Sequence, residues 1–150
     1  MQRIMQSLEN HHKHCDDAFA AAEAAVVKRQ WDEASRLQDA FRAAMEAHFE
    51  AEESLLFPAF EAATGHTSGP TEVMRTEHSQ IRNLLGAMAD ALAGKDADDF
   101  FGHAGTLVIM MQQHNLKEEN ILYPMCDSSL SGNADELAER LRSALDSGST

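Results

Sequence analysis

The segment HFEAEESLLFP at residues 48–58 recurs as HNLKEENILYP at residues 114–124. Five of the eleven letters are identical, and each copy has a histidine first, a glutamate four residues later and a proline last. The same shift of 66 residues, from 48 to 114, also places His12 on His78. An internal repeat of this kind predicts a duplicated structural unit. We therefore expect two copies of one helix hairpin, related by an approximate two-fold axis.

Composition favours helices around these segments. The 150 residues include only three prolines and eight glycines, and strong helix formers such as Ala, Glu and Leu are plentiful. Apolar residues recur at steps of three and four, which is typical of amphipathic helices. The predicted helices span about residues 2–28, 32–62, 70–94 and 96–125, with a fifth that starts near Asn133. Pro58 and Pro124 are expected to end or kink their helices.

These helices predict an all-α fold. We expect an antiparallel up-down-up-down four-helix bundle built from two hairpin repeats, plus a short C-terminal helix. A chain of 150 residues has the length of one domain. We divide it into the bundle, residues 1–128, and a short C-terminal amphipathic helix and tail, residues 129–150. Leu137, Leu141 and Leu145 form the apolar stripe of that last helix.

Charge and composition exclude several classes of function. A net charge of −13 repels phosphate backbones and anionic lipids, so neither nucleic acid nor a membrane is an expected partner. No apolar stretch approaches the roughly 18 residues of a membrane-spanning helix, and the first residues lack the apolar region of a signal peptide. The two cysteines, Cys15 and Cys126, form no CxxC pair, so a disulfide framework is not indicated. The expected localisation is cytoplasmic.

Four histidines occupy positions where the apolar stripes call for hydrophobic residues: His12, His48, His78 and His114. The interval is 36 residues both from 12 to 48 and from 78 to 114. At a rise of about 1.5 Å per residue, each pair lies at one height on antiparallel neighbours. Glu52 and Glu118 follow one helical turn later on the same face. Glu53 and Glu119 lie about 100° further round, where they are either solvated or contact the histidines from outside.

Metal ions explain this combination of side chains. Burying four imidazoles and two carboxylates in an apolar bundle is costly unless other charges compensate. Imidazole nitrogen and carboxylate oxygen together suit iron, with zinc or manganese as substitutes. Six ligands exceed one tetrahedral zinc site, so we expect two iron ions with an oxo or hydroxo bridge and room for a small ligand. The predicted metal ligands are His12, His48, Glu52, His78, His114 and Glu118.

Other residues near His12 leave alternatives. His11 and His14 flank it, and either could be the ligand of the first helix. The repeat register favours His12 and leaves the other two at the surface. Asp16 lies one turn from His12 and is a candidate for an extra ligand or an acceptor. His103 lies about 16 Å from the metal layer along its helix, and we expect it to be structural.

Three sulfur-containing side chains are expected next to the metal layer. Cys15 aligns with a core position of the repeat and is expected to be a small buried residue, with a redox role as the alternative. Met45 and Met111 flank the layer, either as packing residues or as a gate for small ligands.

With these motifs the sequence resembles the hemerythrin-like (HHE cation-binding) family. The resemblance is carried by His12, by HFEAE at 48–52, EH at 77–78 and HNLKE at 114–118, and it covers about residues 5–126. It implies a four-helix bundle with a non-haem di-iron centre held by the matching residues. Arg82 stands where the oxygen-carrying hemerythrins have a further histidine. The last ligand pair is H-x-x-x-E instead of their H-x-x-x-x-D. The pattern of four histidines and two glutamates is closer to the bacterial iron-centre repair proteins.

The resemblance implies a protein that binds or reacts with O₂, NO or peroxide, or that donates iron for repair. The expected partner is therefore a small diatomic ligand or peroxide, and a homodimer is left open. The alternative is a metal-dependent sensor or interaction module without catalysis, in which metal occupancy changes the packing of the last helix. A ferritin-like enzyme would use paired Glu-x-x-His motifs; Glu9 and His12 form one, but Arg75 at the equivalent position removes the second. Whether the protein is an enzyme stays open.

Overall fold

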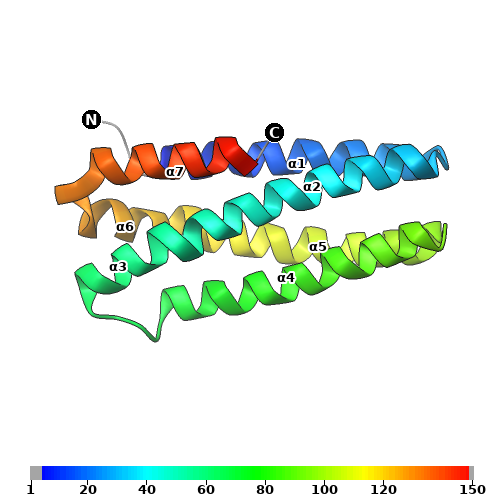
Figure 1. Ribbon diagram of the computed structural model, residues 1–150. Helices are drawn as coiled ribbons and strands as arrows, with labels where there is room; N and C mark the ends of the chain where they lie inside the picture. Colours follow the sequence, from blue (N-terminus) through cyan, green and yellow to red (C-terminus); the bar gives the residue numbers. More distant parts are fainter. Residues whose placement is uncertain (1–4, 149–150) are drawn as a thin grey trace.

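The computed structural model describes residues 5–148, and every regular element in this range is helical (Figure 1). The predicted all-α class is therefore confirmed. Three of the predicted helices correspond to α1, Gln6–Val27, α4, Pro70–Ala93, and α7, Ala134–Gly148. The prediction that the first helix begins at residue 2 lies outside the described residues. A short 3₁₀ turn, η3, Ser131–Asn133, precedes α7.

Each of the other two predicted helices contains a π turn and continues beyond it. One runs from α2, Trp31–Ala51, through η1, Glu52–Leu56, into α3, Phe57–Thr64. Its counterpart runs from α5, Ala97–Lys117, through η2, Glu118–Leu122, into α6, Tyr123–Ser129. A proline would clash with the carbonyl four residues earlier in an α-helix. The wider π turn relieves that clash and carries the helix past Pro58 and Pro124. Of the expected end or kink at these prolines, the end is therefore wrong.

The two hairpin turns repeat in detail. Arg29 and Lys95, which are 66 positions apart, are the two non-glycine residues of the described chain with positive φ, at 57° and 54°. Each turn closes with the same backbone hydrogen bonds, such as Gln30 N to Ala25 O at 3.0 Å and Asp96 N to Ala91 O at 2.9 Å. The duplicated sequence thus folds into two hairpins with the same local geometry.

Successive long helices run in opposite directions, and α7 folds back along α1 and α2 (Figure 1). The core consists of two apolar clusters. One lies toward the hairpin turns and includes Phe19, Phe41 and Phe100. The other lies toward the opposite end and includes Tyr123 together with Leu141 of α7. The buried histidines and glutamates belong to neither cluster, and residues of both clusters are their neighbours in sequence.

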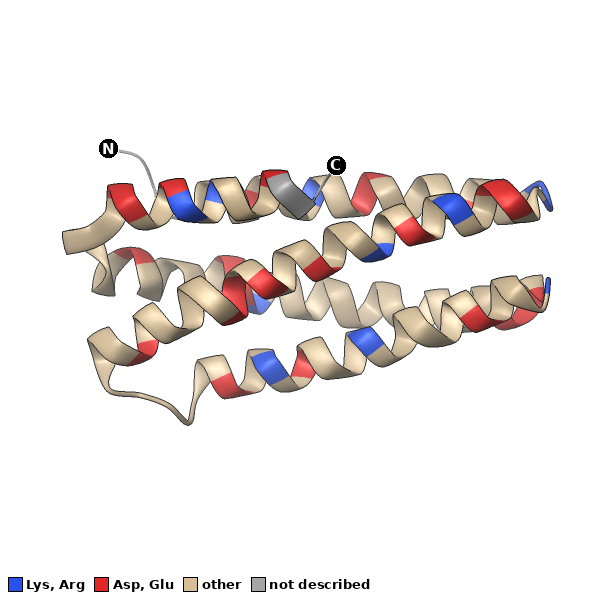
Figure 2. Ribbon diagram, viewed as in Figure 1, with Lys and Arg blue, Asp and Glu red and all other residues tan. Residues whose placement is uncertain are grey.

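The outer surface is acidic. Figure 2 shows Asp and Glu spread along the helices, with fewer Lys and Arg among them, in line with the net charge of −13. Within the described range, none of the helices combines the length and apolar character needed to cross a bilayer.

Candidate metal centre

The six predicted ligands converge in the middle of the bundle. α1 supplies His12, and α4 supplies His78. α2 and α5 supply His48 and His114 in their last turns, and the adjoining π turns begin with the two glutamates. All six are buried, and Glu52, His78 and Glu118 have no exposed surface. The ligand atoms form two sets, and within each set all the atoms lie within 4.8 Å of one another. One set comes from Glu52, His78, His114 and Glu118, and the other from His12, His48 and Glu118.

The imidazoles direct Nε2 toward the carboxylates. His12 Nε2 lies 3.1 Å from Glu118 Oε1, and His114 Nε2 lies 3.4 Å from the same oxygen. His48 Nε2 lies 3.6 Å from Glu52 Oε2 and 3.9 Å from Glu118 Oε1. His78 Nε2 lies 3.1 Å from Glu52 Oε1. The four rings and two carboxylates therefore face one small volume.

Each histidine uses its other nitrogen, Nδ1, outside this volume. His12 Nδ1 lies 2.5 Å from Glu119, and His78 Nδ1 lies 2.6 Å from Glu53. Such contacts orient a metal-binding imidazole and select the tautomer that leaves Nε2 free to bind. Glu53 and Glu119 were expected either in solvent or against the histidines, and the structure places both against the histidines.

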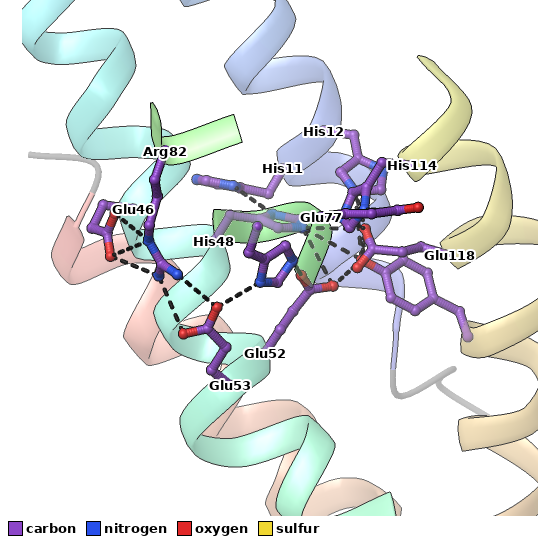
Figure 3. A network of polar contacts seen from close by, with 12 residues as sticks. His11, His12, Glu46, His48, Glu52, Glu53, Glu77, Arg82, His114 and Glu118 are labelled. Atoms are coloured by element: carbon purple, nitrogen blue, oxygen red, sulfur yellow. Dashed lines mark hydrogen bonds and ion pairs between the residues drawn. The ribbon is translucent and has the colours of Figure 1, made fainter. Parts of the chain in front are cut away.

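The remaining two histidines have outer neighbours that the sequence analysis did not identify. His114 Nδ1 lies 2.7 Å from Glu77 Oε1. His48 Nδ1 lies 3.1 Å from His11 Nδ1 (Figure 3). The expectation that His11 is a surface residue is wrong, because its exposure is 7 % and it packs against His48. His14 is exposed, as expected.

The polar atoms of the cluster do not all find hydrogen-bond partners within it, and bound cations would satisfy them. Four of its buried atoms have no hydrogen-bond partner: Glu52 Oε1, His78 Nε2, His114 Nε2 and Glu118 Oε2. Glu52 Oε1 and His78 Nε2 are 3.1 Å apart, yet they lack the alignment of a hydrogen bond. Buried polar atoms without partners are costly. Lone pairs on carboxylate oxygen and imidazole nitrogen that converge in this way form a donor set for first-row transition metals.

Electrostatics show the same demand for positive charge. Burial opposes protonation of His48, but Glu52 and Glu118 outweigh it and raise its pKa to about 10. Burial is likewise outweighed at His114, where Glu118 raises the pKa to about 9. The pKa of Glu118 is lowered in spite of burial, through Glu52 and His114. In the metal-free chain protons on the imidazoles balance the carboxylates, so protons and cations compete for the same nitrogens.

Tyr123 is a further member of the site that the sequence analysis missed. Its hydroxyl donates to Glu52 Oε2 at 2.7 Å and to Glu118 Oε1 at 3.1 Å. It also lies 3.4 Å from Nε2 of both His12 and His48. Burial and the two carboxylates raise its pKa well above the ordinary value, so the phenol keeps its proton. The sequence did contain a signal for this role. Tyr123 aligns with Phe57 in the repeat, and of these two rings only Tyr123 has a hydroxyl.

A small cavity of about 10 Å³ borders the cluster. Its polar lining comes from His12, His48, His114 and Asn115, and its other walls are Cys15, Met45, Phe49, Ile81 and Met111. Cys15 is buried and its pKa is raised to about 12 by burial, Asp16 and Glu52, which keeps the thiol protonated. The expected positions of Cys15, Met45 and Met111 beside the site are confirmed. A volume of about 10 Å³ is at the lower limit for one water molecule, so the cavity holds nothing larger than that.

Two other candidates lie outside the cluster. Asp16 is exposed, and it is in neither set of converging ligand atoms. His103 is partly exposed and pairs with Asp99 of its own helix at 3.4 Å, which agrees with the expected structural role.

Comparison with known proteins gives one finding. A family model described as the hemerythrin HHE cation-binding domain matches residues 3–126. The match includes all six converging residues and ends within α6, so α7 lies beyond it. No curated protein and no solved structure matches the chain.

Proposed function

The chain belongs to the hemerythrin HHE cation-binding family, and from this premise we propose that it is a non-haem di-iron protein that binds or reacts with O₂, NO or peroxide. The observation that carries the proposal is the convergence of four histidine nitrogens and two carboxylates in one buried layer. Donation of iron for repair is compatible with the same site.

We assign one ion to His78 and His114 and the other to His12 and His48. Glu118 belongs to both sets of converging atoms, and Glu52 contacts His78 and His48 with different oxygens. The two carboxylates are therefore placed to serve both ions. Their negative charges offset part of the charge of two divalent cations, which makes burial of the ions less costly.

Bound iron would supply electron transfer and coordination positions for a small ligand. The chain supplies the surroundings for that chemistry. Met45, Ile81 and Met111 wall the adjacent cavity with apolar groups and limit it to small molecules. Tyr123 holds a proton at its phenol oxygen within 3.4 Å of both His12 and His48. That proton is directed at Glu52 and Glu118, so Tyr123 orients the two carboxylates that would hold the ions.

A second candidate function is a metal-dependent sensor without catalysis. α7 packs against η1, the π turn that begins with Glu52. A change in how Glu52 is held could therefore be transmitted to α7. This function predicts a change in α7 packing or in assembly on metal binding, with no response to O₂, NO or peroxide.

Metal analysis of the purified full chain tests the proposal. Wild-type protein loaded anaerobically with Fe²⁺ should retain two ions per chain, and it should develop a charge-transfer band only when O₂, NO or peroxide is added. His48→Ala and His114→Ala should each lose retained metal and the band. His14→Ala is the matched control, since this histidine is exposed and should leave both unchanged.

Two results would contradict the proposal. If wild-type protein retained no more metal than the His48→Ala/His114→Ala double variant, the site would not be a metal centre. If the wild-type protein retained two ions but its absorption spectrum did not change with O₂, NO or peroxide, the sensor function would replace the redox function.

A further inference from the structure

The two halves of the repeat supply equivalent inner residues but different outer contacts. Glu53 and Glu119 are equivalent in the repeat, which has a period of 66 residues. His78 contacts Glu53, and His12 contacts Glu119. The other outer neighbours do not match. His114 contacts Glu77, whereas the equivalent contact of His48 is to His11. An acceptor carboxylate makes a metal-binding imidazole a stronger ligand than a neutral acceptor does.

Basic residues clamp the outer glutamates on the His78–His114 side. Arg82 binds Glu53 at 2.9 Å and bridges it to Glu46 (Figure 3). Lys117 pairs with Glu77. The side chains of Glu53 and Glu77 are 23 % and 18 % exposed, so both are largely enclosed. His78 itself has no exposed surface.

The His12–His48 side lacks these clamps. Asp16, an acidic residue, stands at the repeat position of Arg82, and Ala51 stands at that of Lys117. Among the described residues, no basic side chain pairs with Glu119, whose side chain is 40 % exposed. The imidazole of His12 is 9 % exposed, against none for His78. The residues that contact His12 and His48 from outside are therefore less firmly held than those that contact His78 and His114.

A groove between α1 and α7 reaches this side of the centre. It has a volume of about 340 Å³, and it is lined by Ser7, Asn10, His11, His14, Arg142, Leu145 and Asp146. His11 therefore borders the groove and also contacts His48 at 3.1 Å. Histidine and carboxylate side chains in such a groove can bind a divalent cation transiently. α7 forms one wall and lies outside the part of the chain that matches the family model.

We propose that the two cation positions exchange at different rates: the ion held by His12 and His48 enters and leaves through the groove at His11, and the ion held by His78 and His114 is retained. The proposal rests on the di-metal function proposed above. An ion can pass from the groove to the centre with a turn of the His11 and His48 rings. On the opposite side the Arg82–Glu53 and Lys117–Glu77 pairs keep His78 and His114 in place.

Release of Zn²⁺ from the loaded full chain to a chromogenic chelator tests the proposal. We expect two phases of one ion each, with rates that differ by about 10-fold or more, the scale on which outer contacts change metal binding. His12→Ala should remove the fast phase, and His78→Ala should remove the slow phase.

A reciprocal exchange of outer residues tests the cause without deleting a ligand. His11→Glu gives His48 the acceptor that His114 has, and it should slow the fast phase. Glu77→His should accelerate the slow phase. His14→Glu, which adds the same charge to the groove without contacting His48, is the control for charge, and it should change the fast phase less than His11→Glu does.

The outcomes separate the two proposals. Binding of fewer than two ions contradicts the di-metal function. Two bound ions released in a single phase, or a fast phase that is lost in His78→Ala instead of His12→Ala, overturn only the exchange proposal. Equal effects of His11→Glu and His14→Glu would also overturn it, because added charge alone would then explain the change.

Discussion

At the scale of single residues, one hydroxyl breaks the symmetry of a duplicated site. Tyr123 and Phe57 are equivalent in the repeat, and both rings are fully buried. Phe57 stacks near His78, with ring centres 5.7 Å apart. The single proton of the Tyr123 hydroxyl is instead shared between Glu52 at 2.7 Å and Glu118 at 3.1 Å. The hydroxyl thus adds a donor for carboxylates that otherwise depend on the imidazoles or on cations.

Tyr123→Phe should destabilise the metal-free protein. It removes a hydrogen bond to a buried charged group, which contributes about 1.5–3 kcal/mol. The free energy of unfolding in urea should fall by about this amount at neutral pH. The loss should be smaller in zinc-loaded protein, where cations satisfy the carboxylates. An unchanged urea midpoint in the metal-free state would show that the hydroxyl contributes nothing to stability.

At the scale of elements, the π turns are what align the two ends of each long helix. A π turn accommodates one residue more than an α turn, which rotates everything beyond it. Glu52 at the start of η1 and Phe57 and Phe60 after it are all buried. η2 begins in the same way at Glu118, after the second His-x-x-x-Glu motif. The duplicated π turns place a ligand carboxylate at the point where the helix widens.

Deleting Ser54 should convert η1 into ordinary α-helix while Phe57 and Phe60 keep facing the core, because five residues of a π turn and four of an α-helix advance the chain by about the same angle. Pro58 would then clash with the carbonyl four residues earlier, at a cost of about 3 kcal/mol or more. This should appear as a large drop in the thermal midpoint. Ser54→Ala, at the same exposed position, should stay within about 0.5 kcal/mol of wild type. Equal stabilities of the two variants would show that the π turn is dispensable.

At the scale of the whole molecule, a charged layer separates two apolar clusters. The clusters stabilise the ends of the bundle by burying apolar side chains. The layer between them contains two carboxyl groups at full burial, and buried negative charge there needs compensating positive charge. Protons on the imidazoles supply it in the metal-free chain, as the raised pKa values of His48 and His114 indicate.

The metal-free protein should lose stability at alkaline pH. The folded-state pKa values of His48 and His114, about 10 and about 9, exceed the ordinary 6.5. Protonation therefore stabilises the fold fully below pH 6.5, and this contribution disappears as the pH rises through 9 to 10. The thermal midpoint of chelator-treated protein should fall between pH 7 and pH 10. Zinc-loaded protein is the control, because cations occupy the same nitrogens. A midpoint that is flat or rising for the metal-free form would contradict this account.

Much of the site could be predicted because periodicity and spacing are local properties. The equal intervals from His12 to His48 and from His78 to His114 place the histidines at one height whatever the details of packing. Glu52 and Glu118 follow from the four-residue step. The helical class follows from the apolar steps of three and four.

Other contacts could not be predicted because they join segments that are distant in sequence. Tyr123 reaches Glu52 across the bundle, over 71 positions of the chain. His11 is one residue from His12, and helical periodicity alone put it at the surface. In the structure it lies against α2 and beside the groove that α7 forms, so its burial depends on tertiary packing.

The amino-acid sequence by itself determined that the chain is helical, that it is a duplicated hairpin and that six nitrogen- and oxygen-bearing side chains share one layer. Only the tertiary structure decided which nitrogen of each histidine faces inward, which residue holds the other nitrogen, and how the two sides of the centre differ. The physical reason is one of range. Helical periodicity depends on residues three and four positions apart, whereas the orientation of a buried ring depends on partners from other helices and on π turns that rotate them into reach.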